Sequence, residues 1–193
     1  CLCWSCLAAV FFDHAVFDAT WKDRWTDHAW HEDSQPFTLR RGRLHTSVDG
    51  RFYHISAPFD APFRGETLVL QYRVWHTRRV ECGGGYVKLV DSSTHDDSPH
   101  TKDTPYRIMF GPDACGQHNR THVIFSHNGT YHERSEPLPC PVDTAPHVYT
   151  LRLTRDGLYS VHIDNEHKAS GALRDDWAVL PARNIVDPRF VKP

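Results

Sequence analysis

A run of three glycines and the alternating segment after it, residues 82–89, hold side chains that could bind a polar ligand. Consecutive glycines are disfavoured within a strand by their backbone entropy, and they suit a place where a ligand or another backbone comes close. In the segment that follows, Tyr86 and Lys88 point to one face, and Val87 and Leu89 point to the other. One face therefore packs on a core. The other offers a phenol, an ammonium and bare backbone, which together could hold a sugar.

This stretch belongs to a series of blocks that resembles the globular lectin domain of the calreticulin and calnexin family. The two longest blocks read CGGGYVKL at 82–89 and YRIMFGPDACG at 106–116. Shorter blocks follow in the family's order, at residues 122–125, 147–151, 163–165, 170–171, 175–177, 180–181 and 187–188. The resemblance covers most of residues 10–188, and the two long blocks make it specific.

The resemblance implies a carbohydrate site formed by Tyr86, Lys88, Tyr106, Met109 and Asp113. The chemistry agrees, because a carboxylate accepts hydrogen bonds from sugar hydroxyls and an ammonium donates them. A tyrosine adds a flat apolar face with a hydroxyl, and a methionine fits the apolar side of a pyranose. Taken alone, Tyr106 and Met109 are typical core residues and Asp113 is a typical turn residue. Strict alternation places Tyr106 and Met109 on opposite faces, so we expect a bulge or a strand end between them.

The six cysteines divide between the first residues and the body of the chain. The resemblance implies a disulfide between Cys82 and Cys115 and a buried, unpaired Cys140. In an oxidising compartment, closing this loop would contribute roughly 3.5 to 4 kcal/mol in the chain-entropy account. The three cysteines within residues 1–6 are not expected to bind zinc, because no matching Cys or His pair has ligand spacing.

Two Asn-x-Thr sequons, at Asn119 and Asn128, are glycosylation acceptors if the chain enters a secretory compartment. The Asn-Gly pair at the second sequon also predicts a two-residue hairpin turn. We interpret residues 1–9 as the remnant of a secretory signal peptide. The resemblance implies the lumen of the endoplasmic reticulum, although this sequence contains no retention signal.

The composition narrows the possible partners. The 193 residues include 22 Lys and Arg and 24 Asp and Glu, so the near-neutral chain is not expected to bind nucleic acid or an anionic membrane surface. No apolar run is long enough to span a bilayer. The length allows one substantial domain, which we assign to residues 10–188, and residues 189–193 then begin the proline-rich arm of the family.

Alternating apolar residues predict strands, at residues 52–55, 67–76, 122–125, 149–153 and 159–163. Asn-Gly and Asp-Gly pairs predict the turns, and the polar residues 91–105 predict a loop. Many short strands at this spacing predict an all-β antiparallel sandwich without a long helix. The resemblance makes it a jelly roll of the legume-lectin or concanavalin A type, possibly incomplete at its C-terminus.

The function implied by the resemblance is that of a chaperone rather than an enzyme. Such a lectin module binds monoglucosylated high-mannose N-glycans on nascent and unfolded glycoproteins. Two alternatives stay open. The exposed sheet face could bind peptide or protein without glycan, or the sandwich could be a jelly-roll glycoside hydrolase, which needs two carboxylates. The nearest such pair is Asp164 and Glu166 at an expected turn, and Asp175 and Asp176 resemble a structural block of the family.

Two further family features are expected to be incomplete. The family's arm binds a thioredoxin-family disulfide isomerase, and residues 189–193 alone do not support that partner. The resemblance also implies a structural Ca²⁺. We expect its site to be incomplete, because the loop at residues 42–44 is short and the ligating carboxylate belongs to a segment beyond residue 193. His28 and His31 could bind a metal by their spacing, but they lack a third ligand.

Overall fold

The structure, a computed structural model, describes residues 13–61, 63–91 and 100–177. Its contacts divide the chain into two compact units, Cys1–Gly65 with Val90–Pro105, and Glu66–Leu89 with Tyr106–Pro193. The proposed signal remnant at 1–9 and the proposed arm at 189–193 lie outside the described residues. The domain boundaries at residues 10 and 188 therefore stay predictions.

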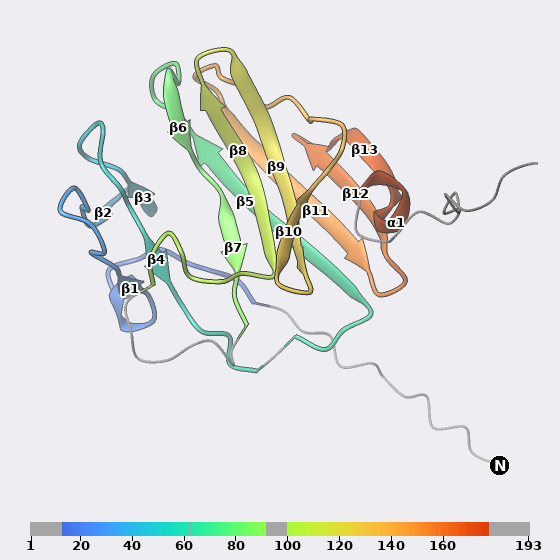
Figure 1. Ribbon diagram of the computed structural model, residues 1–193. Coiled ribbons are helices and arrows are strands. Elements are labelled where there is room, and N and C mark those ends of the chain that lie inside the picture. Colours follow the sequence, from blue (N-terminus) through green and yellow to red (C-terminus); the bar gives the residue numbers. More distant parts are fainter. Residues whose placement is uncertain (1–12, 62, 92–99, 178–193) are drawn as a thin grey trace, which may run out of the picture. The chain divides into compact units, whose positions relative to one another are not determined.

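The second unit is a sandwich of two antiparallel sheets, one behind the other in Figure 1. One sheet has the order β10-β9-β8-β6, with β7 also paired to β8. Its strands are β6 (Cys82–Gly84), β7 (Val87–Leu89), β8 (Ile108–Cys115), β9 (His118–His127) and β10 (Thr130–Glu133). The other sheet has the order β13-β12-β11-β5. Its strands are β5 (Thr67–Trp75), β11 (Pro146–Thr154), β12 (Leu158–Ile163) and β13 (Glu166–Ala172). The predicted all-β antiparallel sandwich is confirmed.

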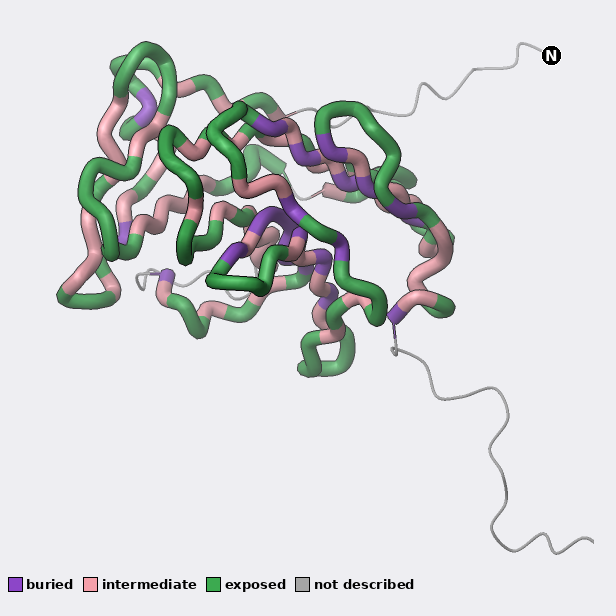
Figure 2. The backbone as a smooth tube through the Cα atoms, turned by 90° about the horizontal axis from the view of Figure 1, so that it is seen from above, coloured by how far each residue is buried: buried purple, intermediate pink, exposed green. Residues whose placement is uncertain are grey.

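The core lies between these sheets and follows from the period of two in the sequence. Phe110, Val123, Leu151 and Val161 are at most 1 % exposed. Their neighbours along each strand are turned to the other face. Figure 2 shows the result as buried residues that alternate with less buried ones along the strands. The predicted strand at 67–76 has this pattern throughout β5.

Strands β6 and β7 form one line along β8, interrupted at Pro112. Gly84 pairs with Asp113 and Val87 pairs with Phe110, in the same register. Proline has no N–H to donate, so the ladder is broken at that point. The amide of Gly85 still donates to the Pro112 carbonyl at 2.9 Å.

Gly111 occupies a position that only glycine fits. Its φ is +137°, and an added Cβ would lie 1.7 Å from Tyr72 Oη. That hydroxyl lies 2.8 Å from the carbonyl oxygen of Gly85 and 3.0 Å from that of Phe110, and the two carbonyls share its single proton. The partly buried Tyr72 of β5 therefore ties the two sheets together beside the interruption in β6–β7.

The disulfide implied by the resemblance is present. Cys82 and Cys115 face each other across β6 and β8, and their sulfurs are bonded at 2.06 Å. Cys140 is unpaired and only 7 % exposed. Its Sγ lies 3.7 Å from the backbone oxygen of Asp113, so it packs beneath β8.

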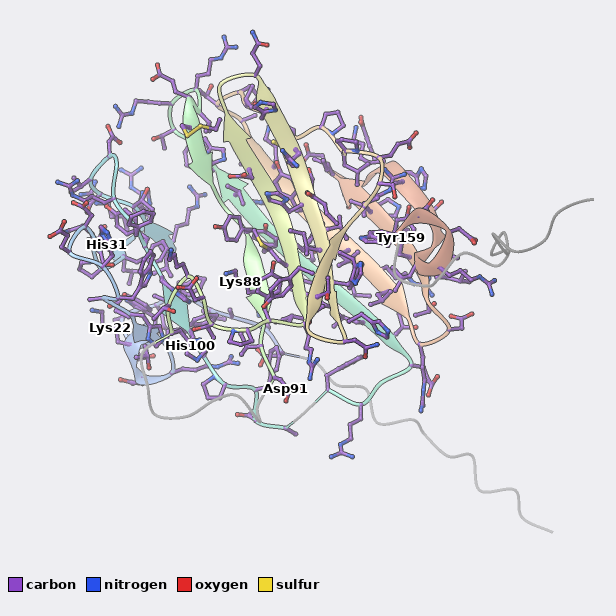
Figure 3. All side chains as sticks on the ribbon, viewed as in Figure 1. Lys22, His31, Lys88, Asp91, His100 and Tyr159 are labelled. Carbon is purple, nitrogen blue, oxygen red and sulfur yellow. A yellow bond between two sulfur atoms is a disulfide. The ribbon has the colours of Figure 1, made fainter. Side chains whose placement is uncertain are left out.

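A short helix, α1 (Leu173–Asp176), follows the last strand. Trp177, 1 % exposed, donates from Nε1 to the Val123 carbonyl at 3.1 Å. The Tyr159 hydroxyl, labelled in Figure 3, donates to Asp176 Oδ2 at 2.6 Å and accepts from Arg134 Nε at 3.0 Å. Within the described ranges, no helix has the length and apolar character needed to cross a membrane.

The first unit contains short elements. They are the 3-10 helix η1 (Trp21–Asp23) and the paired strands β1 (Thr26–Asp27) with β4 (Ile55–Ser56) and β2 (Thr38–Arg40) with β3 (Arg43–His45). His28 lies 2.7 Å from Ser56 Oγ through Nε2, and its Nδ1 accepts from the His100 amide at 3.1 Å. Both ring nitrogens of His28 therefore serve the packing of this unit.

An ion-paired histidine connects two turns of the four-stranded sheet. His147 Nδ1 lies 2.6 Å from Asp164 Oδ2, and its Nε2 lies 2.9 Å from Asp143 Oδ1. Burial lowers the pKa of His147, but its hydrogen bonds to the Asp164 and Asp143 carboxylates outweigh this effect, so the pKa is raised. Burial also opposes ionisation of Asp164, yet the His147 contact and the Val148 amide lower its pKa.

Substituting Gly111 tests the crowding beside Tyr72. Gly111→Ala should lower the free energy of unfolding by about 3 kcal/mol, because the methyl group meets Tyr72 at a strained φ. Gly83→Ala is the matched control, since its Cβ would meet nothing closer than Val80 at 4.0 Å. Urea denaturation measures both, and similar losses in the two variants would contradict the proposed crowding.

Stability should depend on pH through His147. The folded pKa of His147 is raised, so its stabilisation is fully present below the unfolded pKa of about 6.5 and is lost as pH rises through the folded pKa. Wild type should therefore lose more free energy of unfolding between about pH 5.5 and about pH 8 than His147→Gln does. Urea titrations at both pH values measure this difference. An identical pH dependence in the two proteins would show that the pair does not stabilise the fold.

Candidate functional site

The face of the five-stranded sheet that points away from the core carries the predicted site. Residues paired across antiparallel strands share a face, and Phe110, Val123 and Phe125 occupy the buried one. The residues on the opposite face are Cys82, Gly84, Tyr86, Lys88, Met109, Gly111, Asp113, Cys115, His118, Arg120, His122, Ile124, Ser126, Tyr131 and Glu133. We call this set the outer face.

Tyr86 lies in the gap between β6 and β7, where two glycines make room for it. A Cβ at Gly84 would lie 2.5 Å from the Tyr86 ring, and one at Gly111 would lie 2.9 Å from its Cα. The ring packs edge-on against His122, with centroids 6.3 Å apart. Partial burial, and then the charge of Asp113, raise the pKa of Tyr86. Its hydroxyl therefore stays protonated and can donate, while the side chain is still 44 % exposed.

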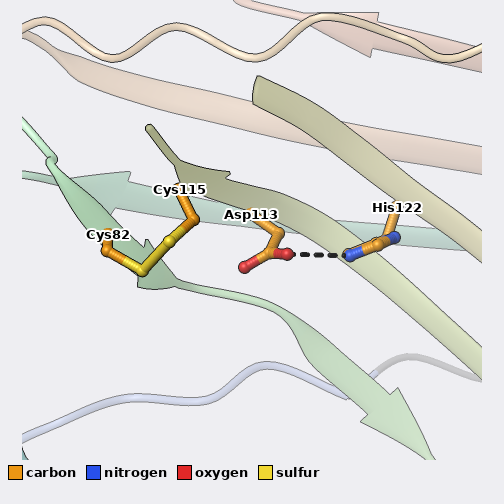
Figure 4. The surroundings of a disulfide bond; sticks show 4 residues. All are labelled: Cys82, Asp113, Cys115 and His122. Atoms are coloured by element: carbon orange, nitrogen blue, oxygen red, sulfur yellow. Dashed lines mark hydrogen bonds and ion pairs between the residues drawn. A yellow bond between two sulfur atoms is a disulfide. The ribbon is translucent and has the colours of Figure 1, made fainter. Parts of the chain in front are cut away.

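Asp113 stands between the disulfide and His122, as Figure 4 shows. The His122 Nε2 lies 3.1 Å from Asp113 Oδ2, and its Nδ1 lies 2.6 Å from Glu133 Oε1. Both contacts are hydrogen bonds only when each ring nitrogen carries a proton. Arg120 completes the chain of charges with a contact of 3.2 Å to Glu133 Oε2. Asp113 is thus oriented, yet its side chain is 40 % exposed and open to a ligand.

A second group gathers around Tyr106. Its ring stacks on Tyr131 with centroids 4.4 Å apart, and Lys88 Nζ lies over it at 4.8 Å. Figure 3 shows Lys88 on its strand of the five-stranded sheet. Burial, followed by the neighbouring Tyr131, raises the pKa of Tyr106. Two phenols and an ammonium, the chemistry expected for a sugar, therefore meet at this end of the outer face.

Met109 lies on the outer face between the group around Asp113 and the group around Tyr106. It pairs with Lys88 on one side and with Ile124 on the other, and it is 8 % exposed. Tyr106 lies outside β8, two residues before its first residue Ile108, which explains how both side chains serve one face despite strict alternation. The structure thus brings all five predicted residues to one face of a single sheet, with Met109 as an apolar floor.

Four outer-face residues escaped the sequence analysis: Arg120, His122, Tyr131 and Glu133. His122 could have been found, because it alternates with the buried Val123 on a predicted strand. Tyr131 and Glu133 need the hairpin register as well. The turn at Asn128, with φ of 49°, and Gly129, with φ of 75°, sets that register.

Both sequons lie in exposed positions of the five-stranded sheet. Asn119 is in β9, and Asn128 projects from the β9–β10 turn, as the Asn-Gly pair predicts. The accessibility that glycosylation requires is therefore met, and the modification stays a prediction.

The short turn at residues 41 and 42 lies in the loop for which the resemblance implies ligands of a structural calcium. Arg41 and Gly42, with φ of 52° and 70°, form a two-residue hairpin turn between β2 and β3. Arg40 and Arg43 flank it, and Arg40, Arg41 and Arg43 are all exposed. The incomplete calcium site stays a prediction.

Among the described residues, one group has the ligand spacing of a metal site: His31, Glu32 and Asp33. His31 Nδ1 accepts from the Asp33 amide at 3.0 Å, and Asp33 pairs with Arg51 at 3.0 Å. These contacts already use the two groups, so the cluster serves the local turn.

The acidic residues considered for a hydrolase have structural partners. Asp164 and Asn165 form the β12–β13 turn with φ of 56° and 65°. The Asp164 carboxylate bonds to His147 and to the Val148 amide. Asp176 accepts from Tyr159.

Comparison with known proteins agrees with this arrangement. The family model described as the calreticulin family matches residues 16–193. Calreticulin of Caenorhabditis elegans is 39 % identical over 198 residues, which cover 96 % of this chain and 50 % of that protein. Calreticulin of Homo sapiens is 40 % identical over 199 residues, which cover 96 % and 47 %. The solved T. cruzi calreticulin globular domain superposes with a TM-score of 0.80 at 35 % identity, over 92 % of this chain and 76 % of that one. The chain spans about half the length of the curated relatives it matches, and it belongs to the calreticulin family.

Proposed function

We propose that this chain is the lectin module of a chaperone that binds monoglucosylated high-mannose N-glycans on unfolded glycoproteins in the lumen of the endoplasmic reticulum. One observation carries the proposal. The phenol of Tyr86, the carboxylate of Asp113 and the ammonium of Lys88 share one open face of a sheet. The membership of the calreticulin family supports the same conclusion.

Each residue has a role in this proposal that its environment supports. Asp113 accepts from sugar hydroxyls, and its contact with His122 holds the carboxylate in place. Tyr86 packs a ring face on the sugar and donates from its hydroxyl. Lys88 donates hydrogen bonds beside Tyr106, and Met109 forms the apolar floor between the two ends.

The two other functions have less support. A hydrolase would need two carboxylates across the scissile bond, and in the candidate pair Asp164 is engaged by His147 in a turn while Glu166 pairs with Lys168. Binding of peptide without glycan has one feature in its favour. The four-stranded sheet exposes Val69 and Leu158, which are 58 % and 47 % exposed. Scattered apolar residues of this kind are common on protein surfaces, so we favour the lectin.

Removing the charge of Asp113 tests the proposal. Asp113→Asn should weaken binding of a monoglucosylated high-mannose oligosaccharide about tenfold or more, because hydrogen bonds to a charged acceptor contribute about 1.5 to 3 kcal/mol. Calorimetric titration of the 193-residue chain measures the affinity. Thermal unfolding of the variant checks that the fold is kept.

Asp175→Asn is the matched control, since Asp175 is an aspartate of the same unit with a side chain that is 71 % exposed. It should leave the affinity unchanged. The lectin assignment is contradicted if wild type binds no glycan, or if both variants bind as wild type does. Retained binding of an unfolded polypeptide in the first case would favour the glycan-independent alternative.

A further inference from the structure

The β2–β3 hairpin of the first unit carries three arginines at its tip. Arg40 ends β2, Arg41 is the first residue of the turn, and Arg43 begins β3. All three residues are exposed. In the part of the chain that the structure describes, the ion pairs of arginine involve neither Arg40 nor Arg41. Their charges are therefore presented to solvent rather than to a carboxylate of the fold.

Two features of this tip oppose the stability of the hairpin. Arg41 has a φ of 52° and Gly42 one of 70°, and a two-residue turn with two positive φ values favours Asn or Asp before the Gly. Arg40 is also the direct register partner of Arg43, and like charges placed opposite each other on paired strands are destabilising. Arginine at these positions therefore does not serve the local fold. Departures of this kind are expected where a residue serves function instead.

The register also decides which way the charges face. Leu39 and Leu44 form the next pair of the hairpin and are half-buried, so their face packs within the unit. Arg40 and Arg43 are adjacent to them along the strands, and successive side chains point to opposite faces. The arginine pair therefore occupies the face that does not pack, and Arg41 adds a third guanidinium at the end of the hairpin.

The chemistry of this tip fits a polyanion. A guanidinium group binds sulfate, phosphate or carboxylate through two parallel hydrogen bonds, and short segments rich in basic residues are typical of polyanion sites. The chain as a whole has 22 Lys and Arg against 24 Asp and Glu, so a broad anionic surface such as a duplex or a bilayer gains no attraction from the rest of it. A thin linear chain with closely spaced sulfates can contact the hairpin tip alone.

We propose that the β2–β3 hairpin tip, with Arg40, Arg41 and Arg43, is a binding site for a sulfated polysaccharide. The site does not depend on the proposed lectin function, because the hairpin belongs to the first compact unit and the proposed glycan site belongs to the second. The chain then recognises two kinds of carbohydrate by different chemistry, a neutral glycan through the outer face and a sulfated one through charge.

The experiment titrates the 193-residue chain with a sulfated octasaccharide prepared from heparin. The double variant Arg40→Gln with Arg43→Gln should weaken binding about tenfold or more, because hydrogen bonds between charged partners are strong. Its affinity should also fall less steeply with salt than that of wild type, since fewer counterions are released. Arg41→Asn should weaken binding about threefold and raise the urea midpoint of unfolding, because Asn-Gly suits this turn. A purely structural role of Arg41 predicts the opposite change in the midpoint.

Arg155→Gln is the matched control, since Arg155 is an arginine of the other unit whose side chain is 74 % exposed. It should leave the affinity for the octasaccharide unchanged. The site is overturned if wild type does not bind the octasaccharide, if the double variant binds as wild type does, or if the same octasaccharide without sulfates binds equally well. Tighter binding of single-stranded DNA or of phosphatidylserine vesicles at the same ionic strength would overturn the assignment to a sulfated polysaccharide.

Discussion

The pairing of β8 on both of its sides is the constraint on which the rest of the sandwich unit depends. On one side it is paired by β9 along its whole length, and on the other by β6 and β7 with a gap at Pro112. The disulfide fixes one end of this second pairing. At this gap, the Tyr72 hydroxyl bonds to the carbonyls of Gly85 and Phe110, and these contacts fix the width of the gap. Tyr86 enters the outer face at this point. Pro112, which interrupts the ladder, therefore also makes room on the outer face for the ring of Tyr86.

The same strand builds the core and the site, because consecutive side chains point to opposite faces. Phe110 and Ala114 are packed between the sheets, while Met109 and Asp113 belong to the outer face. Because protein interiors are closely packed, the buried neighbours Phe110 and Ala114 fix the position of the Asp113 carboxylate. Since loops are more mobile than strands, a site on strand residues loses less entropy when a ligand binds.

Features of the fold and site that depend on residues close together in the sequence could be predicted, and features that depend on distant residues could not. The strands at β5, β9, β11 and β12 follow from local alternation, and the turn at Asn128 follows from a dipeptide. The five site residues came from the family resemblance, and local rules alone assigned Tyr106 and Met109 to the core. Gly111 shows the limit most clearly. Its requirement for glycine arises from Tyr72, which is distant in sequence, and no neighbouring residue signals it.

The charges on the outer face show why the hairpin residues matter to the site. An isolated carboxylate on a sheet loses hydration when a ligand covers it, and this opposes binding. Asp113 faces His122, which is itself held by Glu133, and Arg120 balances that second carboxylate. The chain of contacts supplies fixed hydrogen-bond donors before any ligand arrives, so less reorganisation is required when the carboxylate is covered. Two members of this chain come from β9 and one comes from β10, so the hairpin turn at Asn128 and Gly129 sets the electrostatics of a carboxylate on β8.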